Sequence, residues 1–298
     1  MTSLRSMHFV PAANAKMLQR ALASNADALI LDLEDSVAPE AKEGARLEIC
    51  RWLREIDFGC KQRVVRINAL ATPWGEEDLA MTAETPPDLY MVPKVDGPYD
   101  LERIDGQLRR RSSAAWLETG LIPIATETPA AVLRIVDIAR GPRVRALTWG
   151  AEDLSAALGA RRTRAPSGEY LEVFRFARSM ALLAAAAAGV DAIDGVFVDF
   201  HDLEGLRREA HEAADQGFAG KMTIHPDQID VVNEVFTPSS EDLTAARALL
   251  EAYEQHRSQG RMAFQFKGQM VDAPHLERAR RLLVRAGSVT IPGKPAGS

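Results

Sequence analysis

Eight short apolar runs, separated by stretches of helical character, constrain the fold of this chain more than any other feature. Most of the runs are continuously apolar rather than alternating, which is typical of parallel strands covered on both faces. The runs are Met7–Pro11, Ala28–Leu33, Arg63–Ile67, Leu89–Val92, Leu121–Ala125, Ala146–Trp149, Ala192–Val198 and Lys221–Ile224. The pattern therefore predicts eight strands in a buried parallel sheet.

The stretches between the runs are predicted to be helices. Leu101, Ile104 and Leu108 fall on one helical face. Thr128 followed by Pro129 is typical of a capped helix start. Strand and helix alternate eight times, which favours a (β/α)₈ TIM barrel. The alternative is a doubly wound open sheet, but no G-x-G-x-x-G motif follows the first run.

The pattern changes near residue 237, where the alternation of strand and helix stops. Two amphipathic helices with a short extended segment between them are predicted there instead. We therefore expect a barrel domain over residues 1–236, a C-terminal helical lid over 237–287 and a flexible tail over 288–298.

Ionisable side chains follow most of the runs. In a TIM barrel, the carboxyl ends of the strands meet at the face that carries the active site. Seven of the eight run ends carry such residues, which chance placement at 26% charged residues would not usually produce. These residues are Asp32, Glu34, Asp35, Arg66, Lys94, Glu127, Glu152, Asp153, Asp199, His201, Asp202 and His225. They predict a mostly acidic active-site face.

An acidic face of this kind indicates a divalent cation, because neighbouring carboxylates repel one another unless a positive charge neutralises them. The candidate ligands are oxygens, and Cys50 and Cys60 form no CxxC pair, so Mg²⁺ or Mn²⁺ is expected. Arg66 is suited to hold a substrate carboxylate through two hydrogen bonds. The combination suggests a small carboxylate substrate that also carries a keto or hydroxyl oxygen.

Each candidate also has a purely structural interpretation. Acids at helix starts, such as Glu127 and Asp153, stabilise the helix dipole by ~0.3–1 kcal/mol without any ligand. Arg66 could pair with a neighbouring acid, and Lys94 could be a solvated loop residue. By spacing alone, Asp272 is best interpreted as the cap of the last helix, since an Ala-Pro pair follows it.

Composition excludes several classes of protein. With 36 basic and 42 acidic residues the net charge is −6, so neither nucleic acid nor an anionic membrane is expected as a partner. The longest apolar run, over residues 180–188, is too short to span a bilayer. The first residues lack the apolar core of a secretory signal, and we expect a soluble cytoplasmic protein.

Eight strings occur along the chain in the order of a known family. They are RSMHFVP (5–11), DLEDSVAP (32–39), RIN (66–68), PK (93–94), ETP (127–129), GAEDL (150–154), GKMTIHPDQ (220–228) and GQMVDAPHLERA (268–279). Together they resemble the citrate lyase beta-subunit-like family of the HpcH/HpaI aldolase superfamily, from about Arg5 to Leu283. One departure is Ala12, where the family commonly has glycine.

The resemblance implies a TIM barrel with a C-terminal lid, assembled as a homotrimer or hexamer. It implies Mg²⁺ held by Glu127 and Asp153, where Glu127 also lies at the substrate. It further implies that Arg66 binds the carboxylate of an α-keto acid, and that Asp272 is the acid/base in a neighbouring subunit's site. The groups that would support the metal and its waters are Glu34, Asp35 and Lys94.

The implied activity is Mg²⁺-dependent, reversible C–C cleavage of a 3-hydroxyacyl-CoA thioester of the malyl-CoA or citramalyl-CoA type. The products would be an acyl-CoA such as acetyl-CoA and an α-keto acid, glyoxylate or pyruvate. Arg66 would orient the substrate, and Asp272 would protonate the enolate carbon.

Three alternatives remain open at this point. The first is a citrate lyase beta subunit that acts on a citryl thioester of an acyl carrier protein. The second is a malyl-CoA thioesterase or malate-synthase-like relative, and the third is a non-catalytic barrel. Four cations after the first two strands could contact coenzyme A phosphates, although a solvated helix face is favoured for them. They are Lys16, Arg20, Lys42 and Arg46.

Overall fold

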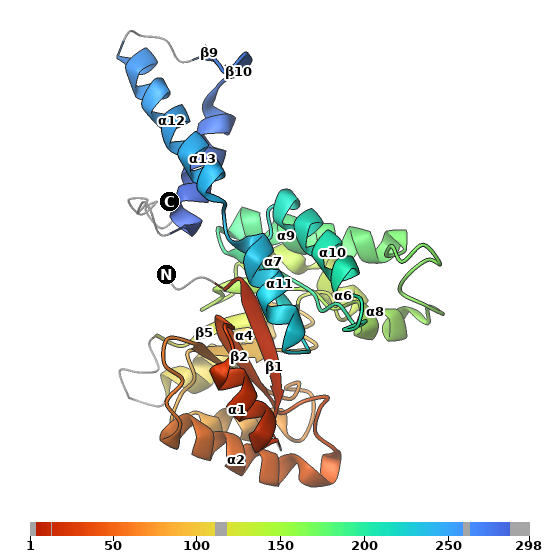
Figure 1. Ribbon diagram of the computed structural model, residues 1–298. Helices are drawn as coiled ribbons and strands as arrows, with labels where there is room; N and C mark the ends of the chain where they lie inside the picture. The colour runs from red at the N-terminus through yellow and green to blue at the C-terminus, as the bar shows by residue number, and fades with distance from the viewer. Residues whose placement is uncertain (1–3, 13, 111–117, 259–262, 287–298) are drawn as a thin grey trace. The chain divides into compact units, whose positions relative to one another are not determined.

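The computed structural model describes residues 4–12, 14–110, 118–258 and 263–286. The chain divides into two compact units, Met1–Phe236 and Thr237–Ser298. The tail predicted over residues 288–298 lies outside the described residues. Figure 1 shows the chain and labels many of its helices and strands.

The first unit is built on eight parallel strands that pair in the order β5-β4-β3-β2-β1-β8-β7-β6. Isolated bridges between Leu121 and Val144 and between Ile124 and Thr148 join the two end strands of this order. The strands are β1 (Ser6–Pro11), β2 (Ala28–Asp32), β3 (Gln62–Arg66), β4 (Leu89–Val92), β5 (Gly120–Pro123), β6 (Ala146–Thr148), β7 (Asp191–Asp194) and β8 (Gly220–Thr223). The eight predicted strands therefore form the predicted (β/α)₈ TIM barrel (Figure 1).

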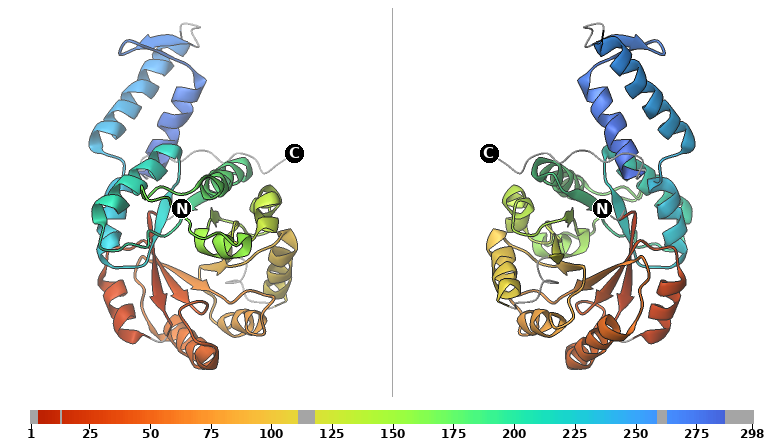
Figure 2. Two further views of the ribbon diagram at one scale, coloured as in Figure 1. Left: turned by 90° about the vertical axis from the view of Figure 1, so that its right-hand side faces the viewer. Right: turned by 90° about the vertical axis from the view of Figure 1, so that its left-hand side faces the viewer.

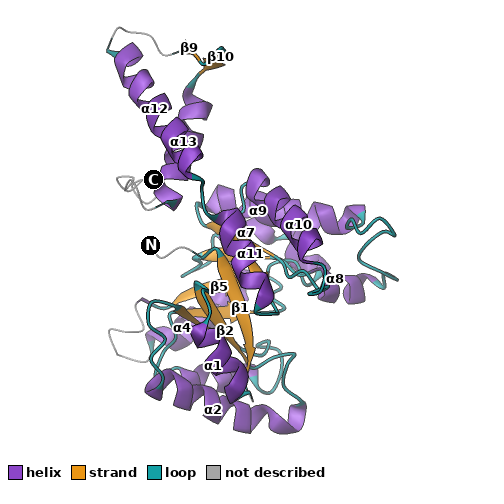
Figure 3. Cartoon of the chain, in the orientation of Figure 1, coloured by secondary structure: helices purple, strands orange, loops and turns teal. Residues whose placement is uncertain are grey.

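Helices alternate with the strands and surround them, as Figures 2 and 3 show. They are η1 (Pro39–Ala41), α1 (Ala15–Ala23), α2 (Lys42–Glu55), α3 (Gly75–Thr82), α4 (Pro98–Arg109), α6 (Pro129–Leu133), α7 (Ile135–Ala139), α8 (Ala151–Leu158), α9 (Glu172–Ala188), α10 (Leu203–Gln216) and α11 (Asp227–Phe236). Within the described part of the chain, every helix is too short or too polar to cross a membrane.

The start of α6 confirms the predicted cap, because the Thr128 hydroxyl accepts a hydrogen bond from the Ala131 N–H at 3.0 Å. The string AAVLRIVDIAR (130–140) predicts one continuous helix, but the structure interrupts it at Arg134. This residue has φ −116° and ψ 13°, outside the helical region, so α7 begins anew after it.

Side chains on the strands alternate between two apolar cores. The residues of the core inside the barrel are Met7, Ala28, Ile30, Val64, Leu89, Met91, Ile122, Ile124, Ala146, Ile193 and Met222. The residues between them, such as Leu29 and Leu31, belong to the core between the sheet and the helices. Because both faces of the strands are covered, the apolar runs are continuous in the sequence.

The same alternation decides where polar residues at the strand ends point. Asp32 stands two residues after the inward-facing Ile30, so it continues the inward series at the carboxyl end of β2. Arg66 occupies the equivalent place on β3, where it is the register partner of Asp32. Asp194 directly follows the inward-facing Ile193, and it therefore points outward to the helices.

The seventh strand is shorter than the sequence predicts. It ends at Asp194, so Asp199, His201 and Asp202 lie in the loop before α10 rather than at a strand end. Asp202 caps α10, since its Oδ1 accepts a hydrogen bond from the Gly205 N–H at 2.8 Å. This acid therefore has a local structural role.

The second unit contains the two predicted helices, α12 (Ser240–Arg257) and α13 (Ala273–Arg285). The extended segment between them is an antiparallel hairpin of β9 (Phe264–Phe266) and β10 (Gln269–Val271). The sequence pattern allows Ser239 or Ser240 as the cap of α12. The structure has Ser239, whose hydroxyl accepts a hydrogen bond from the Asp242 N–H at 3.0 Å. Two small apolar clusters lie in this unit. One consists of Tyr253, Phe264, Val271 and Leu276, and the other of Ala246, Ala279 and Leu283.

Candidate active site

Arg66, at the end of β3, is surrounded by acids from the end of β2. Its Nε and Nη2 contact the two carboxylate oxygens of Asp32 at 2.7 and 2.8 Å. Its Nη1 lies 2.9 Å from Oε2 of Glu34 and 3.2 Å from Oδ2 of Asp35. Burial alone would lower the pKa of Arg66, but these acids outweigh it and raise the pKa, so the guanidinium stays charged. The guanidinium also lies 4.8 Å from the centre of the Phe9 ring.

The contacts of Arg66 limit how it could bind a substrate. Asp32 is buried and takes one edge of the guanidinium, so that edge is fixed. The Asp35 side chain is 61% exposed and contacts only Nη1. A guanidinium has five N–H donors, so a substrate carboxylate could take a remaining donor or replace Asp35. Arg66 therefore pairs with neighbouring acids, as its structural interpretation predicts. These pairs still leave room for it to bind a substrate carboxylate.

Lys94, just after β4, joins the other predicted site residues. Its Nζ lies 2.5 Å from Oε1 of Glu34 and 3.2 Å from Oδ1 of Asp153. Its backbone N–H donates to Oε2 of Glu127 at 2.5 Å. Glu34 contacts both Lys94 and Arg66, so ion pairs connect residues from the ends of β2, β3, β4 and β6, and the backbone hydrogen bond from Lys94 adds Glu127 from the end of β5. The structural interpretation of Lys94 as a solvated loop residue is therefore wrong.

Glu127 is the most perturbed acid of this group. It stands before the cap of α6 and is only 4% exposed. Burial raises the pKa of Glu127 to about 8, and the charges of Glu34 and Asp153 add to the rise, while the Lys94 N–H opposes it. The raised pKa means that the surrounding positive charges do not offset the cost of burying a negative charge on Glu127.

These observations fit a hard divalent cation. Glu127 and Asp153 offer carboxylate oxygens at the starts of α6 and α8. No group of three or more His, Cys, Asp or Glu side chains arranged for a metal occurs among the described residues. Magnesium commonly takes only one or two protein carboxylates and completes its octahedron with water and substrate. The two acids therefore suit Mg²⁺, with the remaining ligands from outside the chain.

Asp272 belongs to the second unit. It occupies the N-cap position of α13, as its spacing predicts, and its Oδ1 lies 2.6 Å from Nδ1 of His275. Its side chain is 56% exposed, which leaves the carboxylate accessible to a reactant.

Residues 5–226 match the model described as HpcH/HpaI aldolase/citrate lyase. This match covers most of the chain. The chain belongs to the HpcH/HpaI aldolase/citrate lyase family. It is therefore an enzyme of a lyase family, and the family expected from its motifs is confirmed.

Several members of the HpcH/HpaI family with assigned activities are similar to this chain along most of their length. The mitochondrial citramalyl-CoA lyase of Homo sapiens is 35% identical, over 96% of this chain and 86% of that protein. The (3S)-malyl-CoA thioesterase of Cereibacter sphaeroides is 34% identical, over 96% and 95% of the two chains. The citrate lyase subunit beta of Escherichia coli is 37% identical, over 95% and 93%.

Solved structures of the family agree with the fold. Protein CitE from Mycobacterium tuberculosis, in complex with magnesium, acetoacetate and coenzyme A, superposes with a TM-score of 0.79. It is 36% identical, and the match covers 96% of this chain and 98% of that chain. A second structure of that protein contains magnesium and pyruvate, and has a TM-score of 0.72 at 33% identity.

Two buried networks of this family member were missed by the sequence analysis. The first holds the loop that carries Glu34. Lys42 Nζ donates to the Leu33 and Glu34 carbonyls at 2.8 Å each and to Oδ1 of Asn68 at 2.7 Å. Neither Lys42 nor Arg46 is a solvated or phosphate-binding cation, since both are buried and Arg46 pairs with Asp78 at 2.8 Å. Lys42 therefore holds the backbone of Glu34 in place and does not itself contact the carboxylates of the candidate site.

The second network centres on Asp194, which is fully buried between the barrel and its helices. Its carboxylate accepts hydrogen bonds from Arg178 and from Lys221 Nζ, the latter at 2.7 Å, and from Trp149 Nε1 at 2.7 Å. Burial raises the pKa of Asp194, but the two cations outweigh it and hold the pKa below its ordinary value. Trp149 directly precedes Gly150 and α8, so this network fixes the strand end that leads to Asp153.

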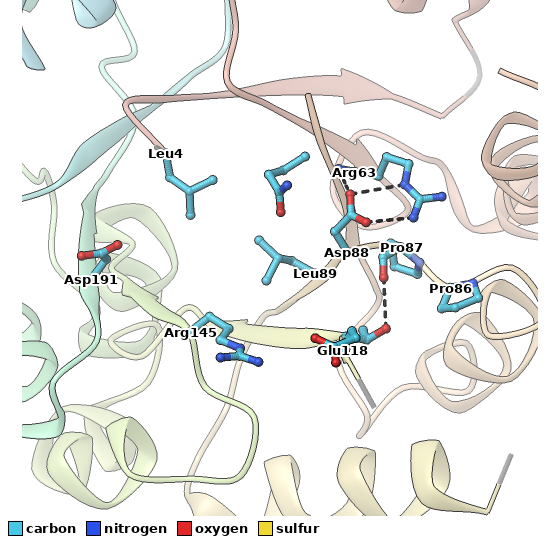
Figure 4. A pocket seen from close by; sticks show the side chains of 11 residues that line it. Leu4, Arg63, Pro86, Pro87, Asp88, Leu89, Glu118, Arg145 and Asp191 are labelled. Atoms are coloured by element: carbon cyan, nitrogen blue, oxygen red, sulfur yellow. Dashed lines mark hydrogen bonds and ion pairs between the residues drawn. The ribbon is translucent and has the colours of Figure 1, made fainter. Parts of the chain in front are cut away.

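A cavity of about 480 Å³ opens at the amino ends of the strands, opposite the end that carries the acidic residues (Figure 4). Its lining includes Gln62, Leu89 and Asp191, which begin β3, β4 and β7. Figure 4 also shows Asp88 paired with Arg63. The shortest distance between their charged atoms is 2.8 Å. None of the predicted site residues lines it. Residues at the amino ends of TIM-barrel strands serve stability rather than catalysis, so this cavity is not a candidate active site.

Proposed function

We propose that this enzyme cleaves a 3-hydroxyacyl-CoA thioester reversibly into an acyl-CoA and an α-keto acid. Substrates of the malyl-CoA and citramalyl-CoA type fit the site, because they combine a carboxylate, a hydroxyl and a thioester. The observation that carries the proposal is the connection of Arg66, Glu127 and Asp153 through Glu34 and Lys94 at the carboxyl end of the barrel. The names of the relatives support the same class of reaction.

Each residue has a distinct part in the proposed reaction. Glu127 and Asp153 would hold Mg²⁺, which when bound supplies Lewis-acid stabilisation of negative charge on the substrate oxygens. Arg66 would bind and orient the α-carboxylate, since its guanidinium is charged and fixed by Asp32. The structures of similar proteins with magnesium, coenzyme A and small keto acids support this ligand set.

Asp272 would complete the reaction as the acid/base. When the C–C bond breaks, its electron pair moves onto the carbon beside the thioester. Asp272 would donate a proton to that carbon. The hydroxyl proton would pass to solvent as the keto group forms, and Asp272 would take a proton back from solvent, so the protons balance. In the condensation direction, Asp272 would remove the same proton. We propose that Asp272 enters the site of a neighbouring subunit in a homotrimer or hexamer.

A thioesterase is the second candidate function. The Cereibacter relative is named as a malyl-CoA thioesterase at 34% identity, close to the identity of the lyase relatives. A citrate lyase subunit that takes its substrate from an acyl carrier protein is the third candidate, supported by the Escherichia relative. All three would use the same carboxylate-rich site.

A coupled assay separates these functions. Purified protein with Mg²⁺ is offered malyl-CoA and citramalyl-CoA, and α-keto acid and free thiol are followed separately. Keto acid without thiol, abolished by a chelator, is the expected result. Thiol without keto acid identifies a thioesterase. If neither product forms, the proposal fails and citryl-loaded acyl carrier protein is tested next.

Two further parts of the proposal concern assembly and location. Light scattering on the purified protein should give three or six times the mass of one chain. Fractionation of the source cells tests the expected cytoplasmic location, since the citramalyl-CoA lyases among the relatives are named mitochondrial.

A further inference from the structure

Lys94 contacts four acids of the candidate site, although the reaction proposed above gives it no part. Its ammonium lies 2.5 Å from Glu34, 3.2 Å from Asp153 and 4.0 Å from Asp35. Its backbone N–H holds Glu127. One residue therefore contacts both acids that are proposed to bind the metal, through two chemically different groups.

The backbone of Lys94 explains how it reaches both. Its φ is +51°, in the left-handed region that residues with a side chain rarely adopt. Such conformations persist where the surrounding structure enforces them, and they gather at functional sites. Here the turn aims the N–H at Glu127 while the side chain extends to Glu34 and Asp153.

We propose that Lys94 is a built-in counter-cation that competes with the divalent metal for Asp153 and so sets the metal affinity of the site. The inference rests on the metal site in the proposed function. An ammonium 3.2 Å from Oδ1 of Asp153 neutralises that carboxylate and repels a second cation near it. The shorter contact with Glu34 gives the ammonium a partner that it keeps when Asp153 turns to a metal. Lys94 is thus a positioning residue, which holds the acids in place and weakens their attraction for a metal.

Two substitutions separate the side chain from the backbone. Lys94→Met removes the ammonium and keeps the apolar stem, whereas Lys94→Gly also removes the strain of the positive φ. Both retain the N–H that holds Glu127. Lys61→Met is the matched control, since it removes a lysine just before β3, at the opposite end of the barrel. Its ammonium there donates to the Ser24 carbonyl.

The experiment is a calorimetric titration of the full chain with MgCl₂ in the absence of substrate. Because a positive charge next to a ligand oxygen is removed, Lys94→Met and Lys94→Gly should bind Mg²⁺ about tenfold more tightly than the wild type. Mg²⁺ should also raise the Tm of both variants more than that of the wild type. Lys61→Met should match the wild type in both measurements.

Other outcomes overturn the inference in distinguishable ways. If the wild type binds Mg²⁺ and both Lys94 variants bind it equally or more weakly, Lys94 does not compete with the metal. If neither the wild type nor the two Lys94 variants bind Mg²⁺, the inference fails and the metal part of the proposed function fails as well. Lys94→Arg keeps the positive charge and should stay within about threefold of the wild type. Tightening in Lys94→Arg as large as in Lys94→Met would also overturn the inference, because charge would not be the cause.

Discussion

Arg66 and Asp32 are register partners on adjacent strands, and their side chains form a two-point ion pair with contacts of 2.7 and 2.8 Å. Both side chains are largely buried. The pair fixes one edge of the guanidinium, so the remaining donors face the acids that precede η1. The orientation of Arg66 is therefore set before any substrate arrives.

Asp32→Asn should disturb both stability and substrate binding. Loss of one partner leaves a buried guanidinium less well compensated, which we expect to cost about 3 kcal/mol of unfolding free energy. We expect KM for the thioester substrate to rise about tenfold, since Arg66 loses its fixed orientation. Urea unfolding and steady-state kinetics measure the two effects.

The matched control is Asp88→Asn. Asp88 pairs with Arg63, which lies near the amino end of β3, whereas Arg66 lies at its carboxyl end. Both side chains of the Asp88–Arg63 pair are partly exposed. A pair of this kind contributes at most about 1 kcal/mol, and KM should not change. Equal KM changes in both variants would contradict a role for Arg66 in substrate binding.

Glu127 should lose a proton when the metal binds. Its pKa of about 8 means that most of the metal-free protein carries this proton at pH 7. Mg²⁺ binding should therefore release about one proton per ion at pH 7 and almost none at pH 9. Calorimetry in two buffers of different ionisation enthalpy measures the release. Absence of proton release at pH 7 would exclude Glu127 as a ligand with this pKa.

The same raised pKa has a consequence for stability. Since the folded pKa lies above the usual value of 4.5, the folded state holds this proton more tightly than the unfolded state. The stabilisation is fully present below about pH 4.5 and is lost as the pH rises through about 8. Glu127→Gln should remove this part of the pH dependence in metal-free protein, as urea unfolding across that range can measure.

Asp272→Asn should abolish turnover while it leaves the fold and substrate binding nearly intact. Asparagine caps a helix about as well as aspartate, so α13 should keep its stability. Asparagine cannot transfer the proton, so kcat should fall by at least about a hundredfold. Near-normal turnover would rule out Asp272 as the acid/base. Ser239→Ala serves as a control, since it removes the cap of α12 without touching a proposed catalytic group.

Gly150→Ala should move Glu127. A Cβ at this position would lie 3.2 Å from Glu127 Cγ, which is tighter than an ordinary contact. The φ and ψ of −132° and 126° suit alanine, so the effect comes from crowding alone. We expect about 1 kcal/mol of destabilisation and a threefold or greater loss of Mg²⁺ affinity. Gly106→Ala, where a Cβ meets nothing within 4 Å, should stabilise the protein and leave Mg²⁺ binding unchanged.

Asp194→Asn should be strongly destabilising without any direct effect on the reacting atoms. It removes the fully buried carboxylate that Lys221 and Arg178 share, and Lys221, whose side chain is 0% exposed, keeps only Glu209 as an acidic partner. We expect a loss of about 3–5 kcal/mol in urea unfolding. Glu212→Gln, on the exposed edge of the same network, should cost less than about 1 kcal/mol. Comparable losses in both variants would contradict the central place of Asp194.

Local patterns predicted most of the fold. The eight apolar runs and the Thr128 cap depend on neighbouring residues. Each run overlaps a strand in the structure, although the seventh strand is shorter than its run, and Thr128 caps α6. The prediction failed where distant contacts decide the outcome. Lys42 and Arg46 look like a solvated basic face in sequence, yet they are buried because Asn68 and Asp78 supply partners from another element.

The sequence by itself determined the barrel, its family and the set of ionisable residues at the strand ends, because strand periodicity places those residues at one face. Only the tertiary structure decided how they are paired. Asp32 faces into the barrel and Asp194 faces away from it, since their positions relative to the inward-facing residues differ by one step. Lys94 meets Glu34 and Asp153 across 60 and 59 positions of the chain. No local pattern encodes such contacts, since they depend on the closure of the barrel.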